Sequence, residues 1–520
     1  MIMVQIPALE IQATSPQDSI PLEAVANLFQ ALHQRGVRYC HWKSNLRLEQ
    51  ALQGRTDLDL LVDRRHNQAF RQVLCEHNVK SALAAPGRRY PAVEDHLGFD
   101  PPSGRLFHLH VHYQLVLGEQ FVKNYRLPLE ACLLDSARLR LGVNIPAPEW
   151  ELIVLALRAL LKYRDRDAIK DLLSIRSPGL PAHILSEIEY LSSQTSRERI
   201  ARMLTGAAGV APRGVVLEFL DTVAAAPRAG YKLYRLRKRA RRALRPYQWR
   251  PRWRATLLYF REMWQRRSFL QLSPARKMTL PIGGAVLALV GADGAGKTTL
   301  AQMLVKWLAG KLDVHFYYLG SKQPSRRSRL SYLAFRMARR SHRALCGALG
   351  DANVFSRWIG GLRDSFLCLH HLFIGQDRYR RYLAGRKKAA AGSLVIYDRY
   401  PLEFISTQRE YRLLDGPQIY LTGVAGNGAI PGALARAEQN LYLKIRPPDF
   451  LFVLNVSPEV SMQRKPDHQR PVVEAKSRAV GDLASKAERG ARKSGVIHLN
   501  ADLPFEEVWS QLKTRVWEVL

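Results

Sequence analysis

Nine residues in the second half of the chain have the types and spacing of a phosphate-binding loop. They read Gly-Ala-Asp-Gly-Ala-Gly-Lys-Thr-Thr over positions 291–299 and fit G-x-x-x-x-G-K-[ST] at every fixed position. In such a loop the backbone amides point at phosphate oxygens, the lysine reaches the β- and γ-phosphates, and the hydroxyl holds Mg²⁺. The pattern therefore predicts a site for ATP and Mg²⁺ made of Gly291, Asp293, Gly294, Ala295, Gly296, Lys297, Thr298 and Thr299.

A second group of residues suited to chemistry lies in the first half of the chain. Asp57 and Asp59 are separated by one leucine, and side chains two residues apart lie on the same face of a strand. Two carboxylates held together repel each other unless a cation lies between them, so the pair indicates a divalent metal site. His108, His110 and His112 repeat the same alternation. They could complete this site, with His110 as a ligand of a softer metal, or form a half-buried polar strand face.

The elements around the phosphate-binding loop predict how it is held. The apolar run 284–290 has the composition of a strand, and residues 300–308 carry apolar side chains at helical spacing. Ligands of open α/β sheets lie beyond the carboxyl ends of the strands. Asp398, which ends such a strand, is expected to hold Mg²⁺ directly or through water, and Arg399 to bind a substrate phosphate. We expect a parallel sheet flanked by helices, with further strands over 314–319, 393–398, 448–456 and 494–502 and a closing helix over 504–520.

Residues 280–520 resemble the thymidylate kinase family of P-loop nucleoside monophosphate kinases. The matching motifs are the loop, Asp-Arg-Tyr at 398–400, Pro-Asp at 448–449, Pro-Glu-Val-x-x-x-Arg at 458–464 and Asn-Ala-Asp at 500–502. The resemblance implies transfer of a phosphoryl group from ATP to thymidine monophosphate, which yields thymidine diphosphate and ADP. It implies that Asp293 faces the acceptor and that Arg464, Lys465 and Arg470 belong to a mobile lid. The catalytic residues that it implies are Lys297, Asp398, Arg399 and Arg464.

The acceptor side departs from that family. After Asp-Arg-Tyr the chain continues Pro-Leu-Glu-Phe-Ile-Ser-Thr-Gln over 401–408, in place of the Gln-rich segment that reads a pyrimidine, and an arginine-rich insert spans about 320–391. Individual arginines of this insert are expected to face solvent. An alternative acceptor is therefore a sugar or lipid-linked glycan of bacterial surface polysaccharide biosynthesis. The alternative from another class is a nucleotide-regulated membrane adaptor in which neither domain turns over.

Residues 21–225 resemble the nucleotidyltransferase superfamily, most closely the uncharacterised nucleotidyltransferase-like proteins of bacterial glycan gene clusters. The matching features are Gly-x-x-Asp-x-Asp at 54–59 after a helix expected over 21–36, the upstream Lys43, the His-rich strand, and a long helix expected over 150–175. The resemblance implies an α+β domain. Members usually carry a third carboxylate where this chain has histidines, so nucleotidyl transfer with Mg²⁺ alone is not expected.

The net charge of +34 is concentrated in two segments. Residues 228–277 hold 17 Lys and Arg against one acid, and residues 320–390 hold 16 against three. Arginines interleaved with aromatic residues in the first segment suit an anionic membrane surface, and nucleic acid less well. The alternative is a solvated linker helix with no partner. The expected plan is therefore a tail over 1–20, a domain over 21–225, a basic helical linker over 226–279 and a P-loop domain over 280–520.

Three further observations bear on location. The five cysteines are scattered without a C-x-x-C pair, residues 1–20 lack a basic segment followed by an apolar one, and no run of 18 residues is apolar and free of charge. Together they predict a cytoplasmic protein, at most peripheral at the inner face of a membrane. The partners expected are a small phosphorylated or sugar acceptor and that membrane surface, and the oligomeric state is left open.

Overall fold

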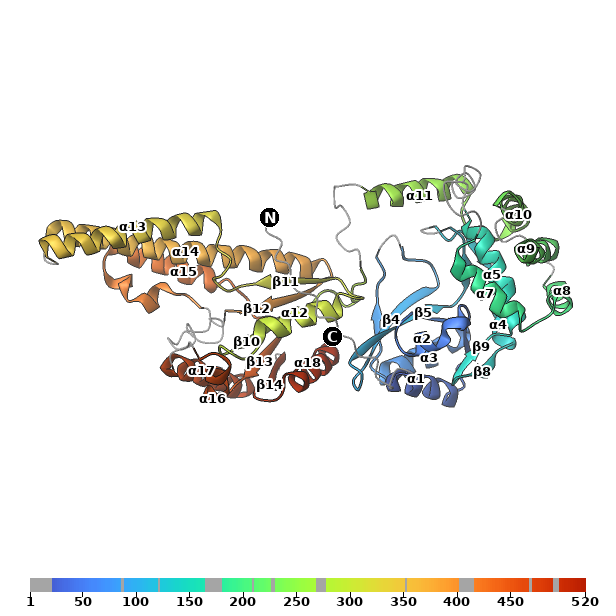
Figure 1. Ribbon diagram of the computed structural model, residues 1–520, viewed down its shortest axis with the longest axis horizontal. Coiled ribbons are helices and arrows are strands. Elements are labelled where there is room, and N and C mark those ends of the chain that lie inside the picture. The colour runs from blue at the N-terminus through green and yellow to red at the C-terminus, as the bar shows by residue number, and fades with distance from the viewer. Residues whose placement is uncertain are drawn as a thin grey trace. The chain divides into compact units, whose positions relative to one another are not determined.

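The chain divides into two compact units, Met1–Ser273 and Pro274–Leu520. Figure 1 shows their secondary structure. The computed structural model describes residues 21–85, 88–119, 122–163, 180–207, 210–225, 230–267, 277–350, 353–401, 416–466, 470–489 and 495–520. The expected tail over 1–20 and most of the acceptor-side segment over 401–408 lie outside the described residues.

Unit 1 contains a five-stranded mixed sheet in the order β1-β2-β5-β4-β3. The parallel pair β2 and β5 lies at its centre, and the other neighbours are antiparallel. This is the α+β architecture expected for the first half, although it does not test the likeness to nucleotidyltransferases. The strands are β1 (Tyr39–His41), β2 (Leu58–Val62), β3 (Lys80–Ala82), β4 (Val93–Asp100) and β5 (Arg105–His112), and two small hairpins pair β6 (Leu115–Leu117) with β7 (Tyr125–Leu127) and β8 (Arg138–Arg140) with β9 (Val143–Ile145).

The two faces of this sheet differ because the side chains alternate. The apolar residues of β2 and β5, such as Leu60 and Leu109, are buried in one core with helices α1 (Glu23–Gln34) and α3 (Asn67–Glu76). Asp57, Asp59 and the histidines of β5 alternate with those residues and so lie on the opposite face, as the sequence predicts. Short helices α2 (Leu48–Leu52) and α4 (Glu130–Asp135) lie in the connections.

A second core of unit 1 is helical. It gathers around α5 (Pro148–Lys162), of which all but the last residue is buried. The helices that pack there are α7 (Ala182–Ser192), α8 (Arg197–Gly206), α9 (Arg213–Ala225) and α10 (Gly230–Ala243). The basic helix α10 buries Leu233, Leu236 and Ala240 in this core, because these residues recur at helical spacing. The expected linker over 226–279 is therefore partly wrong, since α10 is a structural helix of unit 1.

Unit 2 contains a five-stranded parallel sheet in the order β11-β12-β10-β13-β14. All its neighbouring strands are parallel, as the sequence predicts. Helices α12 (Lys297–Leu308) and α18 (Phe505–Val519) meet on one face, where the rings of Trp307 and Trp509 are in edge contact. The strands are β10 (Val286–Gly291), β11 (Val314–Tyr318), β12 (Leu394–Asp398), β13 (Phe450–Asn455) and β14 (Gly495–Asn500).

The other face of this sheet is covered by α14 (Val354–Ala390) and α17 (Arg470–Arg489), which share a core with β10, β12 and β13. The arginine-rich insert forms a long helical hairpin of α13 (Arg326–Leu349) and α14, seen in yellow in Figure 1. Helices α15 (Ala429–Tyr442) and α16 (Pro458–Arg464) complete the unit. No helix in the described ranges has the length and apolar character needed to cross a bilayer.

Candidate functional site

The phosphate-binding loop connects the end of β10 to the start of α12. Its glycines are required by the backbone: Gly294 has a φ of +84° and Gly296 a φ of +78°, values that favour glycine. At Gly291 a Cβ atom would come within 2.6 Å of the carbonyl oxygen of Leu454, so the neighbouring strand excludes any side chain. The sequence therefore folds locally into the curled loop that a phosphate requires.

Lys297 lies at the first position of α12 and curls back over the loop. Its ammonium donates to the carbonyl oxygens of Gly291 at 2.8 Å and Ala292 at 2.6 Å. The side chain is buried, and the positive end of α12 adds to its field. These contacts hold the ammonium over the concave side of the loop.

Thr298 and Asp398 meet beside the loop. The Thr298 hydroxyl donates to Asp398 Oδ2 over 2.6 Å, and Asp398 is fully buried. The register pairs Asp398 with Leu289 of β10, so the carboxylate lies at the carboxyl end of the sheet, next to the loop. A hydroxyl and a carboxylate are oxygen donors of the kind that Mg²⁺ prefers, so these two residues fit the predicted metal. Thr299, also predicted to contact the nucleotide, is exposed on the first turn of α12.

Asp293 in the loop lies between two cations. Lys476 on α17 approaches Asp293 Oδ2 at 2.6 Å, and Arg399 approaches Oδ1 at 3.8 Å. Burial would raise the pKa of Asp293, but Lys476, with Lys297 and Arg399, outweighs burial and lowers this pKa to about 2. The sequence did not single out Lys476, although it follows the arginines of the expected lid by a few residues and could have been suspected for that reason.

The three residues expected in a mobile lid, Arg464, Lys465 and Arg470, differ in their contacts. Arg464 donates to the carbonyl oxygen of Ala501 at 2.8 Å and to that of Gly294 at 3.5 Å, so it braces the loop. Ser461, one turn earlier, donates to the carbonyl oxygen of Asp293 at 2.5 Å. Lys465 is exposed, and Arg470 forms an exposed ion pair with Glu474.

A second group of cations converges on Gly320, which follows β11. Arg381 of α14 donates to the Gly320 carbonyl oxygen at 3.3 Å. A Cβ atom at Gly320 would lie 2.2 Å from the Tyr318 hydroxyl and 2.7 Å from Arg399 Cδ. The backbone of Arg399 itself has a φ of +61°, a strained value that fixes where its side chain leaves the strand end.

Arg378 lies one turn before Arg381 and is buried, with a 2.6 Å hydrogen bond to the Tyr442 hydroxyl. The expectation that arginines of the insert face solvent is therefore wrong for Arg378, because the C-terminal half of α14 packs onto the sheet. Arg378 also lowers the pKa of Arg381, together with burial as the larger cause. A half-buried guanidinium group beside a second one, as Arg381 is, is suited to an anionic ligand.

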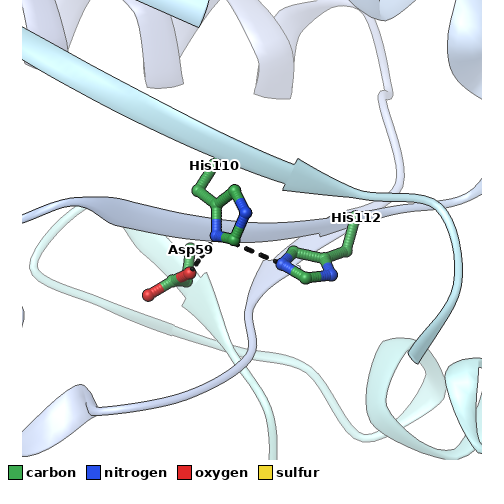
Figure 2. Close-up of side chains that lie close together, drawn as sticks. All are labelled: Asp59, His110 and His112. Carbon is green, nitrogen blue, oxygen red and sulfur yellow. Dashed lines mark hydrogen bonds and ion pairs between the residues drawn. The ribbon is translucent and has the colours of Figure 1, made fainter. Parts of the chain in front are cut away.

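In unit 1, the face of the sheet opposite α1 and α3 carries a cluster of aspartates and histidines. His110 Nδ1 lies 2.9 Å from Asp59 Oδ1, and His112 Nε2 lies 3.3 Å from His110 Nδ1 (Figure 2). Ligand atoms of Asp59, His110 and His112 all lie within 4.8 Å of one another. These three residues could hold a metal ion, with His112 in the place that the sequence assigned to Asp57.

Asp57 is paired with His108 and is not part of this group of three. His108 bridges Asp57, at 2.8 Å, and Asp95 of β4, at 2.9 Å. Burial would lower the pKa of His108, but the two carboxylates outweigh it and raise this pKa to about 9. The alternation of aspartates thus places both on one face, as expected, but each is paired with a histidine.

Lysines surround the cluster. The ammonium of Lys43, 2.6 Å from Asp59 Oδ1, holds the pKa of that carboxyl well below its usual range, against the effect of burial. Burial and repulsion from Lys43 lower the pKa of Lys123 to about 7. The face therefore offers both metal-ligand atoms and cations for an anionic group.

Comparison with known proteins gives few and distant relatives. No protein-family model matches the chain. Over 225 residues it is 28% identical to the uncharacterized ATP-binding protein YghS of Escherichia coli strain K12, covering 43% of this chain and 88% of YghS. Over 240 residues it is 25% identical to the uncharacterized ATP-binding protein YghR of the same strain, covering 44% of this chain and 86% of YghR.

Among solved structures, the deoxyadenosine kinase of M. mycoides with bound dATP aligns with 45% of this chain and 98% of its own. The sequence identity is 12% and the TM-score is 0.28. A TM-score of this size does not establish a common fold.

Proposed function

We propose that unit 2 binds ATP with Mg²⁺ and transfers the γ-phosphoryl group to a small acceptor. The observation that carries this proposal is the contact between Thr298 and Asp398, a hydroxyl and a carboxylate of the kind that Mg²⁺ prefers, beside a complete phosphate-binding loop. An enzyme that transfers phosphoryl groups needs these ligands, the loop lysine and little covalent chemistry of its own. The likeness to YghS and YghR, both described as ATP-binding proteins, supports the nucleotide part of the proposal.

Four residues in and around the loop have roles in this proposal. Thr298 and Asp398 would hold Mg²⁺, which neutralises charge on the phosphates when bound. Lys297 would exchange its two backbone carbonyl contacts for the β- and γ-phosphate oxygens. Arg464 contacts the loop through the Gly294 carbonyl oxygen and would stabilise negative charge on the transferring phosphoryl group.

The acceptor side is best suited to a molecule that carries a phosphate. Arg381 and Arg399 converge at Gly320, next to Asp293, and a guanidinium group binds a phosphate through two parallel hydrogen bonds. Thymidine monophosphate is the acceptor that the family resemblance implies. A phosphorylated sugar or a lipid-linked glycan phosphate suits the same cations and is the alternative.

The proposal is tested by ADP release from the purified full chain, with nucleoside monophosphates, sugar phosphates and lipid-linked glycan extracts as separate acceptors. We expect one acceptor class to stimulate ADP release well above the rate with water, and Arg399→Gln to weaken that acceptor more than ATP. The exposed Arg515→Gln, on α18, is the matched control and should change neither. ATP binding without stimulation by any acceptor would favour the nucleotide-regulated adaptor.

A second function, metal binding by unit 1, is favoured by the cluster of Asp59, His110 and His112. One carboxylate and two imidazoles suit a transition metal better than Mg²⁺. We propose that these three residues bind Mn²⁺ or Zn²⁺, and that Lys43 competes with the metal for Asp59. Nucleotidyl transfer with Mg²⁺ alone is not part of this proposal.

Calorimetry with the full chain and each metal tests this second function. His112→Ala should weaken Zn²⁺ or Mn²⁺ binding, and Lys43→Met should strengthen it because the competing ammonium is removed. His33→Ala, a histidine of the same unit stacked on Tyr39, is the control. Metal binding that survives His112→Ala, or that Lys43→Met weakens, would contradict the assignment. Pyrophosphate release from ATP and Mg²⁺ that depends on Asp57 and Asp59 would identify an ordinary nucleotidyltransferase instead.

A further inference from the structure

Helix α11 (Arg252–Arg267) presents a continuous apolar stripe to solvent. The stripe consists of Trp253, Leu257, Phe260 and Trp264, whose spacing of four, three and four residues places them on one side of a helix. Their exposed fractions are 60, 61, 54 and 64%. Helices of soluble domains normally bury such a stripe, so this one lacks its partner within the described part of unit 1.

Packing within unit 1 does not explain why α11 is a helix. No other described helix or strand of unit 1 makes more than marginal contact with it. A helix of 16 residues is marginal in water when it packs against nothing, because most helical stability comes from burying one face. The preceding helix α10 has a similar basic composition but buries its apolar residues in unit 1. The two helices therefore differ: α10 is part of a core of unit 1, and the apolar stripe of α11 is not.

The charges beside the stripe define that surface. Arg254 and Arg261 flank it on one side and Arg252 on the other, all three exposed. The guanidinium group of Arg254 lies over the Trp253 ring, 5.0 Å from its centroid. Tryptophans with arginines at the edge of an apolar stripe are the composition of helices that lie in the interface of an anionic bilayer.

The start of α11 is held in a fixed place. The Asn124 side-chain amide donates to the Arg250 carbonyl oxygen at 2.7 Å, and Asn124 Oδ1 accepts from the Arg250 amide at 3.1 Å. The Trp249 indole donates to the Lys123 carbonyl oxygen at 3.2 Å. Helix α11 thus follows a segment that hydrogen bonds fix to the rest of unit 1. Its apolar stripe can enter a surface without disturbing either core of that unit.

We propose that α11 docks unit 1 on an anionic lipid surface, with Trp253, Leu257, Phe260 and Trp264 inserted among the acyl chains and the arginines on the headgroups. The inference does not depend on the proposed phosphotransferase, which resides in unit 2. It confines the expected membrane contact of residues 228–277 to one face of one helix. A second copy of the chain and a nucleic acid are the competing occupants.

Vesicle co-sedimentation of the full chain tests the proposal. The wild type should pellet with vesicles of phosphatidylcholine and phosphatidylglycerol in equal parts at low salt, but not with phosphatidylcholine alone. The double variant Trp253→Ser and Phe260→Ser should bind the anionic vesicles at least about tenfold more weakly, because two large apolar groups no longer insert. Ile282→Ser with Ile430→Ser, two exposed apolar residues of unit 2, is the matched control and should bind as the wild type does.

A second pair of variants tests the attraction of the arginines to lipid headgroups separately from apolar insertion. Arg252→Gln with Arg254→Gln should weaken binding more than about tenfold at low salt, since each arginine near an anionic surface is worth roughly fivefold. The difference from wild type should shrink in 1 M salt, where screening acts within about 3 Å. Arg126→Gln with Arg202→Gln, also exposed in unit 1, is the control.

Three results would overturn the proposal. The first is equal binding to neutral and anionic vesicles, and the second is undiminished binding by the Trp253 and Phe260 variant. The third is absence of vesicle binding together with self-association or RNA binding that this variant abolishes, which would assign the stripe to a second copy or to nucleic acid. Circular dichroism and thermal unfolding of every variant should match the wild type, because the stripe contributes to neither core.

Discussion

The hydroxyl of Thr298 donates a 2.6 Å hydrogen bond to Asp398, although 100 residues separate them in the sequence. Thr298 stands on the first turn of α12, and Asp398 ends β12 on the face of the sheet that α12 covers. The contact places two oxygen ligands next to a loop shaped for phosphates. Placing ligands before substrate arrives reduces the reorganisation needed during reaction.

The first prediction concerns this pair. Asp398→Asn and Thr298→Ala should each lower ATP turnover by roughly 10²-fold or more, because each would remove one of the two proposed Mg²⁺ ligands. Thr299→Ala, the exposed neighbour, should retain most of the activity. Steady-state ADP release at several Mg²⁺ concentrations measures the effect. If Thr299→Ala lost as much ATP turnover as Thr298→Ala, the effect would not be specific to the Thr298 hydroxyl. The assignment of Thr298 as an Mg²⁺ ligand would then be contradicted.

The second prediction concerns Lys297. Lys297→Ala should abolish turnover, with a cost of roughly 10²-fold or more, while thermal unfolding stays near that of the wild type. The fold should survive because the ammonium donates to loop carbonyls and the side chain is not part of the apolar core. Lys306→Ala, exposed on the same helix, provides the control. Near-normal turnover in Lys297→Ala would rule out the phosphotransferase reading of unit 2.

The third prediction is a dependence of stability on pH through Asp293. Its pKa is about 2 in the folded chain against an ordinary 3.8, so its stabilising effect is complete above about pH 4 and is lost as the pH falls through 2. Asp293→Asn should therefore lower the free energy of unfolding by about 1–2 kcal/mol at pH 7, and by roughly half as much at pH 3.

Denaturant titrations of both proteins at the two pH values measure this difference. Lys476→Met, which removes the principal partner, should show the same loss at pH 7. A difference between wild type and Asp293→Asn that grows on acidification would mean that the carboxylate is not stabilised by its cations.

The fourth prediction tests the acceptor site. In Gly320→Ala the added methyl group would displace the Tyr318 ring and Arg399, whose atoms lie within 3 Å of its position. We expect the KM for the acceptor to rise about tenfold and the KM for ATP to change little, because the phosphate-binding loop is untouched. Gly310→Ala should change neither KM, because a Cβ atom there would lie 3.6 Å from the nearest atom, the Trp307 carbonyl oxygen. An increase confined to the KM for ATP would place the acceptor elsewhere.

Much of this architecture follows from local patterns in the sequence. The strands of unit 2, the start of α12 and the loop between them were predictable because apolar runs and glycines report local conformation directly. The shared face of Asp57 and Asp59 followed from the two-residue period of a strand. The position of Asp398 beside the loop was predictable as well, because carboxyl ends of parallel strands meet at one edge.

Tertiary structure decided which partners these residues have. Lys476 reaches Asp293 across 183 residues, and Arg381 meets Arg399 at Gly320, because α17 and α14 pack on one face of the sheet. His112, and not Asp57, joins Asp59 and His110 because His108 holds Asp57. Sequence period reports which face a side chain occupies, but not which distant element covers that face.

Helices α10 and α11 also show that the sequence does not report what covers the apolar face of a helix. Both are basic and rich in aromatic and aliphatic residues, and the sequence therefore treats them as one segment. In the folded chain α10 buries Leu233, Leu236 and Ala240 against α5 and α9, whereas α11 leaves Trp253 and Trp264 in solvent. An apolar stripe records that a helix needs a partner. Whether that partner belongs to the same chain is decided only when the chain folds, because packing depends on contacts between residues far apart in sequence.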